Sequence, residues 1–199
     1  HVDTFDYKPE LQAADGREPY DGLTAAWFAN EDEFKRGMDH PLVADALADE
    51  KHFIDADRSV ALLVEERVQV EPRGACPIVL VECLRRPAGI DRATFSERWH
   101  HHAEIGRKAA SLGLLAGYIQ NHALPEGEDA VEVLDDQGSS GESWDGVVTA
   151  YFESMAIAKA LFASPLASEE AFEDERSFID HDKGVYMLAR RNVAKDLVR

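Results

Sequence analysis

The chain has 199 residues, of which 45% are apolar and 30% are charged, enough apolar material for one globular domain or two small ones. This composition excludes disordered and collagen-like chains. Acidic residues outnumber basic ones by 39 to 21, and the net charge of −18 would repel nucleic acid and anionic membrane surfaces. No apolar run approaches the roughly 20 residues that span a bilayer. We therefore expect no nucleic acid or membrane partner. The two cysteines, Cys76 and Cys83, cannot bridge if they lie on one strand, where they would be about 23 Å apart, and this predicts a reducing, cytoplasmic location.

An internal repeat organises the chain. Residues 20–28 match residues 144–152, and residues 53–55 return as 178–180 after a one-residue slip. Such self-similarity indicates two copies of one fold. We assign residues 1–70 to the second half of a first copy and residues 77–194 to a complete second copy. The segment 78–121 has no counterpart in the first copy, which we therefore expect to be truncated at its N-terminus.

Six elements are predicted for the complete copy, in the order strand, helix, strand, strand, helix, strand. The strands are rich in β-branched and aromatic residues, and turn residues separate the elements. The expected ranges are 78–84, 91–112, 116–124, 144–153, 154–178 and 185–190, with a loop over 125–143. This order is that of the ferredoxin-like βαββαβ unit, an α+β fold with both helices on one face of an antiparallel sheet.

Capping residues mark where the helices begin. Either Asp91 or Thr94 can cap the first helix of the complete copy. The second helix is expected to break and restart at Pro165, because proline is favoured in the first turn of a helix. In the first copy Asn30 is the corresponding cap, and Pro41 marks the same break.

Several motifs also resemble a known family. They are Phe95-Ser96-Glu97-Arg98-Trp99 with His102-Ala103, then residues 117–122, Trp144-Asp145-Gly146 and Phe178-Ile179-Asp180. Together they resemble the EthD-type branch of the dimeric α+β barrels, over nearly the whole chain as a tandem pair. The resemblance implies two ferredoxin-like sheets paired into a barrel with helices outside, and a homo-oligomer. One departure is Glu104, where the family pattern has proline.

The first helix of the complete copy has a histidine on its apolar stripe. At about 100° per residue, Trp99 and His102 fall close to Phe95, whereas His100 and His101 point away. Three consecutive histidines cannot converge on one ion, because metal-binding pairs on a helix are three or four residues apart. We therefore expect no metal site.

The strand at 116–124 places polar side chains on one face. Tyr118, Gln120 and His122 alternate along it and so share a face, which we expect to line a largely apolar pocket opposite His102. Glu82 interrupts the first strand and is a candidate general acid. The predicted catalytic residues are His102, His122, Tyr118 and Glu82, and the predicted substrate-binding residues are Phe95, Trp99, Gln120, Trp144 and Tyr151.

Each of these residues also has a purely structural interpretation. His102 can be a hydrogen-bonded core residue, and Tyr118 and Gln120 can simply satisfy each other. Burying the Glu82 carboxylate is costly unless it is paired, so a salt bridge to a basic residue such as Arg85 or Arg190 is the alternative to catalysis.

Glycine-rich nucleotide loops and the Gly-x-Ser-x-Gly elbow are absent from the sequence, which disfavours nucleotide cofactors and acyl-serine chemistry. Haem remains a lesser alternative, because haem peroxidases share the tandem ferredoxin-like fold. The sequence predicts an enzyme without a cofactor, a lyase or isomerase, acting on an aromatic or polycyclic oxygenated small molecule. His102 and His122 would share the proton transfers of a dehydration, cyclisation, isomerisation or decarboxylation, with Tyr118 or Gln120 stabilising an enolate-like oxygen. The alternatives are a non-catalytic binding protein of a catabolic pathway and a structural dimerisation module.

Overall fold

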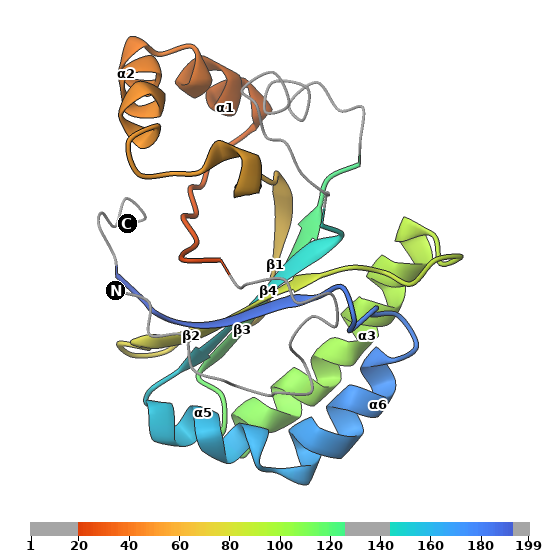
Figure 1. Ribbon diagram of the computed structural model, residues 1–199. Coiled ribbons are helices and arrows are strands. Elements are labelled where there is room, and N and C mark those ends of the chain that lie inside the picture. Colours follow the sequence, from red (N-terminus) through yellow and green to blue (C-terminus); the bar gives the residue numbers. More distant parts are fainter. Residues whose placement is uncertain (1–19, 126–143, 193–199) are drawn as a thin grey trace. The chain divides into compact units, whose positions relative to one another are not determined.

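The computed structural model describes residues 20–125 and 144–192, which divide into two compact units (Figure 1). The sheet unit comprises residues 66–122 and 145–192, and the helical unit comprises residues 23–65 with the short flanks on either side of the 126–143 segment. The loop expected over 125–143 lies almost wholly outside the described residues. None of the described helices is long and apolar enough to cross a membrane.

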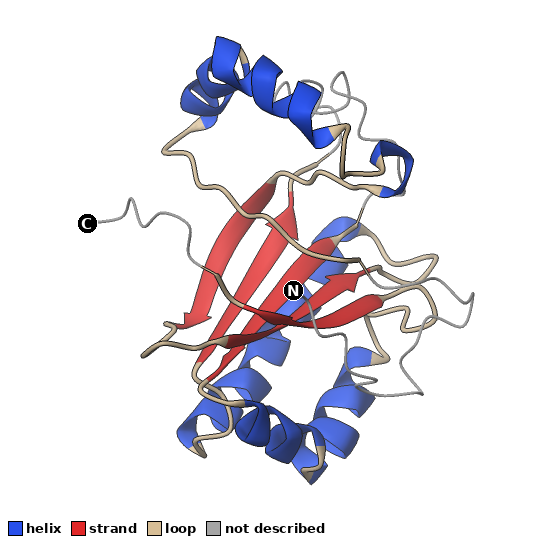
Figure 2. Cartoon of the chain, turned by 60° about the vertical axis from the view of Figure 1, so that its left-hand side comes forward, coloured by secondary structure: helices blue, strands red, loops and turns tan. Residues whose placement is uncertain are grey.

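Five strands form one open sheet in the order β1-β3-β4-β2-β5 (Figures 1 and 2). Their bounds are Val64–Val70, Ile78–Leu84, Gly117–Ala123, Gly146–Phe152 and Val185–Arg190 for β1 to β5. The strand β2 pairs antiparallel with both β4 and β5, and β4 pairs antiparallel with β3. The four strands β2 to β5, with their connecting helices, follow one another in the predicted order. The mixed α+β class is thereby confirmed.

The helices begin and end at residues that satisfy their free backbone groups. The helix α3 (Arg92–Ser111) begins after Asp91, whose Oδ1 accepts the backbone N–H of Thr94 at 2.7 Å. Of the two candidate caps, Asp91 is thus the one used. After β4 come α5 (Met155–Phe162), a π-helical turn (Leu166–Ala171) and α6 (Phe172–Glu175). The expected break at Pro165 is therefore present.

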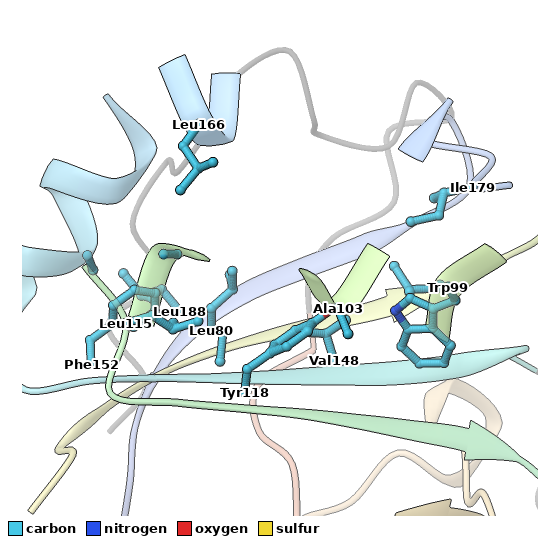
Figure 3. Close-up of a cluster of buried hydrophobic side chains, with 14 of the residues drawn as sticks. Leu80, Trp99, Ala103, Leu115, Tyr118, Val148, Phe152, Leu166, Ile179 and Leu188 are labelled. Atoms are coloured by element: carbon cyan, nitrogen blue, oxygen red, sulfur yellow. The ribbon is translucent and has the colours of Figure 1, made fainter. Parts of the chain in front are cut away.

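The helices α3, α5 and α6 cover one face of the sheet, and the main apolar core lies between them and the strands (Figures 1 and 3). Burying each large apolar side chain contributes about 1.5–3 kcal/mol. One close contact sets the distance between α3 and the sheet: the Trp99 indole of α3 lies directly on Gly146 of β4. A Cβ at Gly146 would sit 2.3 Å from Trp99 Cζ3, so only glycine lets the helix come this close to the sheet.

In the helical unit, the helix α1 (Glu31–Met38) has the predicted cap. Asn30 Oδ1 accepts the backbone N–H of Glu33 at 2.9 Å, and Glu33 Oε2 accepts that of Ala29 at 3.3 Å. The pair resembles a capping box, except that Glu33 binds the N–H of the residue before the cap. The next helix, α2 (Pro41–Glu50), begins at Pro41 as expected.

Residues 22–28, which match β4 in the repeat, form no strand. Apolar side chains of the first copy are exposed where their counterparts are buried. The pairs are Phe28 at 45% against Phe152 at 0%, Leu42 at 68% against Leu166 at 8%, and Phe53 at 71% against Phe178 at 0%. In the second copy β2, α3 and β3 bury these positions, and the described part of the first copy contains no equivalent of those elements. Without them, residues 22–28 have no neighbouring strands in the described part of the chain, and the three side chains stay largely exposed.

The resemblance implied a second sheet and a closed barrel. Residues 20–125 and 144–192 contain one open sheet, so the tandem barrel stays a prediction.

Candidate functional site

The polar residues of β3 lie on the face that α3 covers, as the alternation predicts. Tyr118, Gln120 and His122 are 6%, 0% and 5% exposed. The imidazole of His122 lies against the indole of Trp99, with 4.3 Å between ring centroids. The phenol ring of Tyr118 packs on α3 where Gly106 leaves room, since a Cβ there would be 2.5 Å from the ring.

A chain of hydrogen bonds connects this row to the edge strand β1. Arg107 Nη1 donates to Gln69 Oε1 at 2.6 Å, and Gln69 Nε2 donates to Gln120 Oε1 at 3.1 Å. Gln120 Nε2 in turn donates to the backbone oxygen of Trp99 at 2.6 Å. A guanidinium can only donate and a carbonyl can only accept. The orientation of both side-chain amides is therefore fixed: Arg107 orients that of Gln69, and the Trp99 carbonyl orients that of Gln120.

These orientations assign the tautomer of His122. Its Nε2 lies 3.5 Å from Gln120 Oε1, an acceptor, so Nε2 carries the proton. Its Nδ1 lies 3.1 Å from Ser96 Oγ and therefore presents a lone pair that accepts the serine hydroxyl. Ser96 Oγ also accepts from Arg67 Nη1 at 3.3 Å. The buried imidazole thus has one protonated and one basic nitrogen, and the basic one points to Ser96.

Tyr118 contributes a neutral hydroxyl to the same cluster. Burial raises its pKa strongly, the hydrogen bond with Gln120 opposes this, and the charge of Glu82 raises the pKa further. The phenol therefore stays protonated and keeps its capacity to donate a hydrogen bond. The indole N–H of Trp99 lies close enough to favour the phenolate slightly but does not reach hydrogen-bonding geometry with any described residue. Figure 3 shows this nitrogen on the side of the ring nearer Tyr118.

His102 belongs to a second cluster, between α3 and α6. Its Nδ1 lies 2.8 Å from Asp174 Oδ2 and its Nε2 lies 3.4 Å from Glu175 Oε1. Burial alone would lower the pKa of His102, but hydrogen bonds and charge from Glu175, and then from Asp174, outweigh it and raise the pKa. Each ring nitrogen therefore faces a carboxylate, an arrangement that favours the protonated imidazolium.

The second cluster extends beyond Glu175. Its Oε2 lies 3.5 Å from His181 Nε2, and His181 Nδ1 lies 3.1 Å from the Tyr186 hydroxyl. Glu82 is half-buried on β2, where Tyr186 is its partner in the register with β5. The structure therefore gives His122 and His102 different sets of partners, one of amides and a hydroxyl and the other of carboxylates.

The predicted aromatic residues are divided among several places. Phe95 and Trp99 are buried in the core beneath α3, and Trp144 is buried in the helical unit. Tyr151 alternates with the core-facing Phe152 and so lies on the other face of the sheet, where the Arg191 guanidinium stands 5.5 Å from its ring.

Several residues in contact with the predicted ones were not anticipated. They are Arg67, Gln69, Ser96, Arg107, Asp174 and Glu175. The alternation of polar residues over 64–70 could have indicated an edge strand. That strand would have placed Arg67 and Gln69 beside the sheet. No local pattern marks the two carboxylates, which lie about 72 residues from His102 along the chain and reach it only through the fold.

A surface groove of about 450 Å³ lies elsewhere in the sheet unit. It is lined by Lys108, Leu112, Pro165, Leu166, Glu169 and Glu170, and an ion pair of 2.6 Å between Lys108 and Glu170 crosses it. None of the predicted site residues lines this groove.

Comparison with known families identifies similarity to one domain in particular. The model of the EthD domain matches residues 2–57 and 87–182, a span that includes α3, β3 and β4 with the hydrogen-bonded row described above. No curated protein is similar enough to this chain to count as a match.

Proposed function

The chain belongs to the EthD domain family, and from that membership and the geometry of β3 and α3 we propose cofactor-free acid–base catalysis on a small molecule. The family points to a function that involves small molecules. The proposed substrate is an apolar, oxygenated aromatic or polyketide-like compound. The proposed reaction is a dehydration, cyclisation, isomerisation or decarboxylation. Each of these moves a proton next to an oxygen-bearing carbon.

The observation that carries the proposal is the fixed tautomer of His122. With Nε2 protonated, His122 has its basic nitrogen at Nδ1, and an imidazole is the side chain best suited to take up and release protons near neutral pH. Its Nε2–H is held by Gln120, so the ring is both oriented and ready to accept at Nδ1. The neutral Tyr118 hydroxyl and the Trp99 indole N–H are donors for an enolate-like oxygen. Phe95 and Trp99 supply the apolar surroundings.

We assign the base to His122 rather than to His102 on electrostatic grounds. Both nitrogens of His102 face carboxylates, which raise its pKa and favour the protonated ring. A buried imidazolium has no lone pair to accept a proton. In this proposal His102 positions α6 against α3, and Glu82 contributes through its charge on Tyr118.

Deuterium exchange tests the acid–base step without knowledge of the final product. Tetralone, a benzo-fused cyclic ketone, would be incubated with the full chain in deuterium oxide, and NMR would follow loss of the C–H protons next to its carbonyl. We expect the wild type to accelerate exchange and His122→Gln to lower the enzymatic rate at least about 100-fold. His101→Gln is the matched control, because His101 is an exposed histidine of α3 outside the hydrogen-bonded row on β3, and its loss should leave the rate unchanged.

Two results would overturn the proposal. Exchange no faster than in buffer, together with tetralone binding seen as quenching of tryptophan fluorescence, would indicate the non-catalytic binding protein instead. Wild-type exchange in folded His122→Gln would show that the imidazole takes no part.

A further inference from the structure

Ser96 is the half-buried end of the hydrogen-bond chain that runs through His122. Gln120 and His122 are 0% and 5% exposed, whereas Ser96 is partly accessible. Its hydroxyl donates to His122 Nδ1 across 3.1 Å and accepts from Arg67 across 3.3 Å. A small molecule that approaches these hydrogen-bonded residues from solvent would reach the Ser96 oxygen before the His122 imidazole.

A hydroxyl and an imidazole within hydrogen-bonding distance, with the imidazole held by a third group, are the signature of an activated nucleophile. All three parts are present here. His122 Nδ1 is the base for the Ser96 proton, and Gln120 Oε1 holds Nε2–H as the orienting group. Arg67 places a positive charge beside Ser96 Oγ, which favours an alkoxide and an oxyanion formed next to it. The arrangement recurs on unrelated folds without a shared sequence motif, so the missing nucleophile-elbow motif does not argue against it.

We propose that Ser96 is a nucleophile that is acylated by activated esters of small aromatic alcohols. Ser96 Oγ attacks the ester carbonyl carbon while its proton passes to His122 Nδ1. The bond from the carbonyl carbon to the aryloxy oxygen then breaks, and the departing aryl oxide takes the proton from Nδ1. Water attacks the acyl-serine with Nδ1 again as the base, which releases the carboxylic acid and restores the hydroxyl. The net reaction is ester plus water to acid plus phenol.

The aromatic preference follows from the surroundings of His122. Its ring is stacked against Trp99, and Phe95 lies 5.3 Å from the same indole. The side chains behind Ser96 and His122 are therefore apolar, which suits an aryl leaving group, and Arg67 is placed to face the ester carbonyl oxygen. This activity goes beyond the proposed proton-transfer function, although both use His122.

The first test is covalent labelling of the full chain with a fluorophosphonate, which phosphonylates activated serines, followed by intact mass and peptide mapping. We expect one adduct at Ser96, none in Ser96→Ala, and at least tenfold slower labelling in His122→Gln. Ser111→Ala is the matched control, because Ser111 lies on the same helix with its hydroxyl on the Lys108 carbonyl; its labelling should equal that of the wild type. Hydrolysis of p-nitrophenyl acetate should show a burst that Ser96→Ala abolishes.

Circular dichroism establishes that each variant is folded. If His122→Gln is unfolded, Gln69→Leu replaces it, because that change keeps the imidazole but removes the donor that fixes Gln120, and it too should slow labelling. No adduct at Ser96 in the wild type, or undiminished labelling in the folded variant, overturns the proposal. The two proposals fail separately: loss of tetralone exchange in His122→Gln with no adduct at Ser96 supports the first and refutes the second.

Discussion

We predict that substitutions in the cluster around His102 lower the stability of the protein by different amounts. His102→Ala removes a ring that is 8% exposed and leaves Asp174 and Glu175 side by side without their cation. Breaking a buried ion pair from one side costs about 3–5 kcal/mol, and the lost contact with Phe178, 5.5 Å away between ring centroids, adds a cavity term. The expected loss is about 4 kcal/mol.

Asp174 and Glu175 should contribute unequally to stability, and the carboxylate nearer to His102 should contribute less. Asp174 is nearer to His102, at 2.8 Å against 3.4 Å, but its side chain is 47% exposed whereas that of Glu175 is 18% exposed. Solvent screens the exposed pair, so Asp174→Asn should cost about 0.5 kcal/mol. Glu175→Gln should cost about 2 kcal/mol, typical of a hydrogen bond to a charged group. A double-mutant cycle of His102→Gln with each change isolates the pairwise energies.

The assay is urea unfolding followed by tryptophan fluorescence, which reports mainly on the buried Trp99 and Trp144, since Trp27 is already 65% exposed. The raised folded-state pKa of His102 means that its stabilising contribution is complete below the unfolded pKa of about 6.5. The contribution is lost as pH rises through the folded pKa. Wild type should therefore exceed His102→Gln in stability by more at about pH 6 than at about pH 9. His181→Gln is the companion control, because His181 also contacts Glu175. A larger cost for Asp174→Asn than for Glu175→Gln, or a stability gap that widens with pH, would refute this reasoning.

Three further predictions concern packing and thiol reactivity. Gly146→Ala should destabilise the protein by about 3 kcal/mol in urea unfolding, because the new Cβ overlaps the Trp99 ring; a change below about 0.5 kcal/mol would contradict the packing described. Phe178→Ser should cost about 4 kcal/mol, whereas Phe53→Ser at the repeat-related exposed position should stay within about 0.5 kcal/mol, and equal costs would show that Phe53 is buried. Both cysteines are free thiols, and burial, with a smaller effect of Glu82, raises the pKa of Cys83 to about 12. Cys83 should therefore resist iodoacetamide at about pH 8 in the native chain and react in urea, as peptide mass spectrometry would show.

Local patterns were sufficient to predict the order of strands and helices between residues 78 and 190. Alternation along β3 placed Tyr118, Gln120 and His122 on one face, and helical periodicity placed Trp99 and His102 on the buried stripe of α3. These patterns work because a strand or helix with one buried face must repeat its apolar positions with the period of the backbone. The Asn30 cap and the break at Pro165 were predictable for the same reason, since both depend on residues within one turn.

What the sequence could not predict depends on which elements become neighbours. The edge position of β1 brings Gln69 and Arg67 to β3 and α3, and nothing within residues 64–70 specifies that placement. The repeat predicted more than the first copy can form, because a strand pattern needs adjacent strands for its hydrogen bonds. Residues 22–28 have the pattern of β4 but no strand on either side within the described chain.

The two buried histidines show why their partners, rather than their burial, determine what each can do. Each imidazole is less than a tenth exposed, so each must satisfy its polar atoms inside the protein. His102 does so with two carboxylates, which connect α6 to α3 and favour the protonated ring over one with a basic nitrogen. His122 does so with an amide oxygen and a hydroxyl, partners that carry no charge and that leave Nδ1 as the accepting nitrogen. Arg67 and Arg107 stand at the two ends of the hydrogen-bond chain and can only donate, so they fix the direction of its hydrogen bonds. The basic nitrogen of His122 therefore points to Ser96.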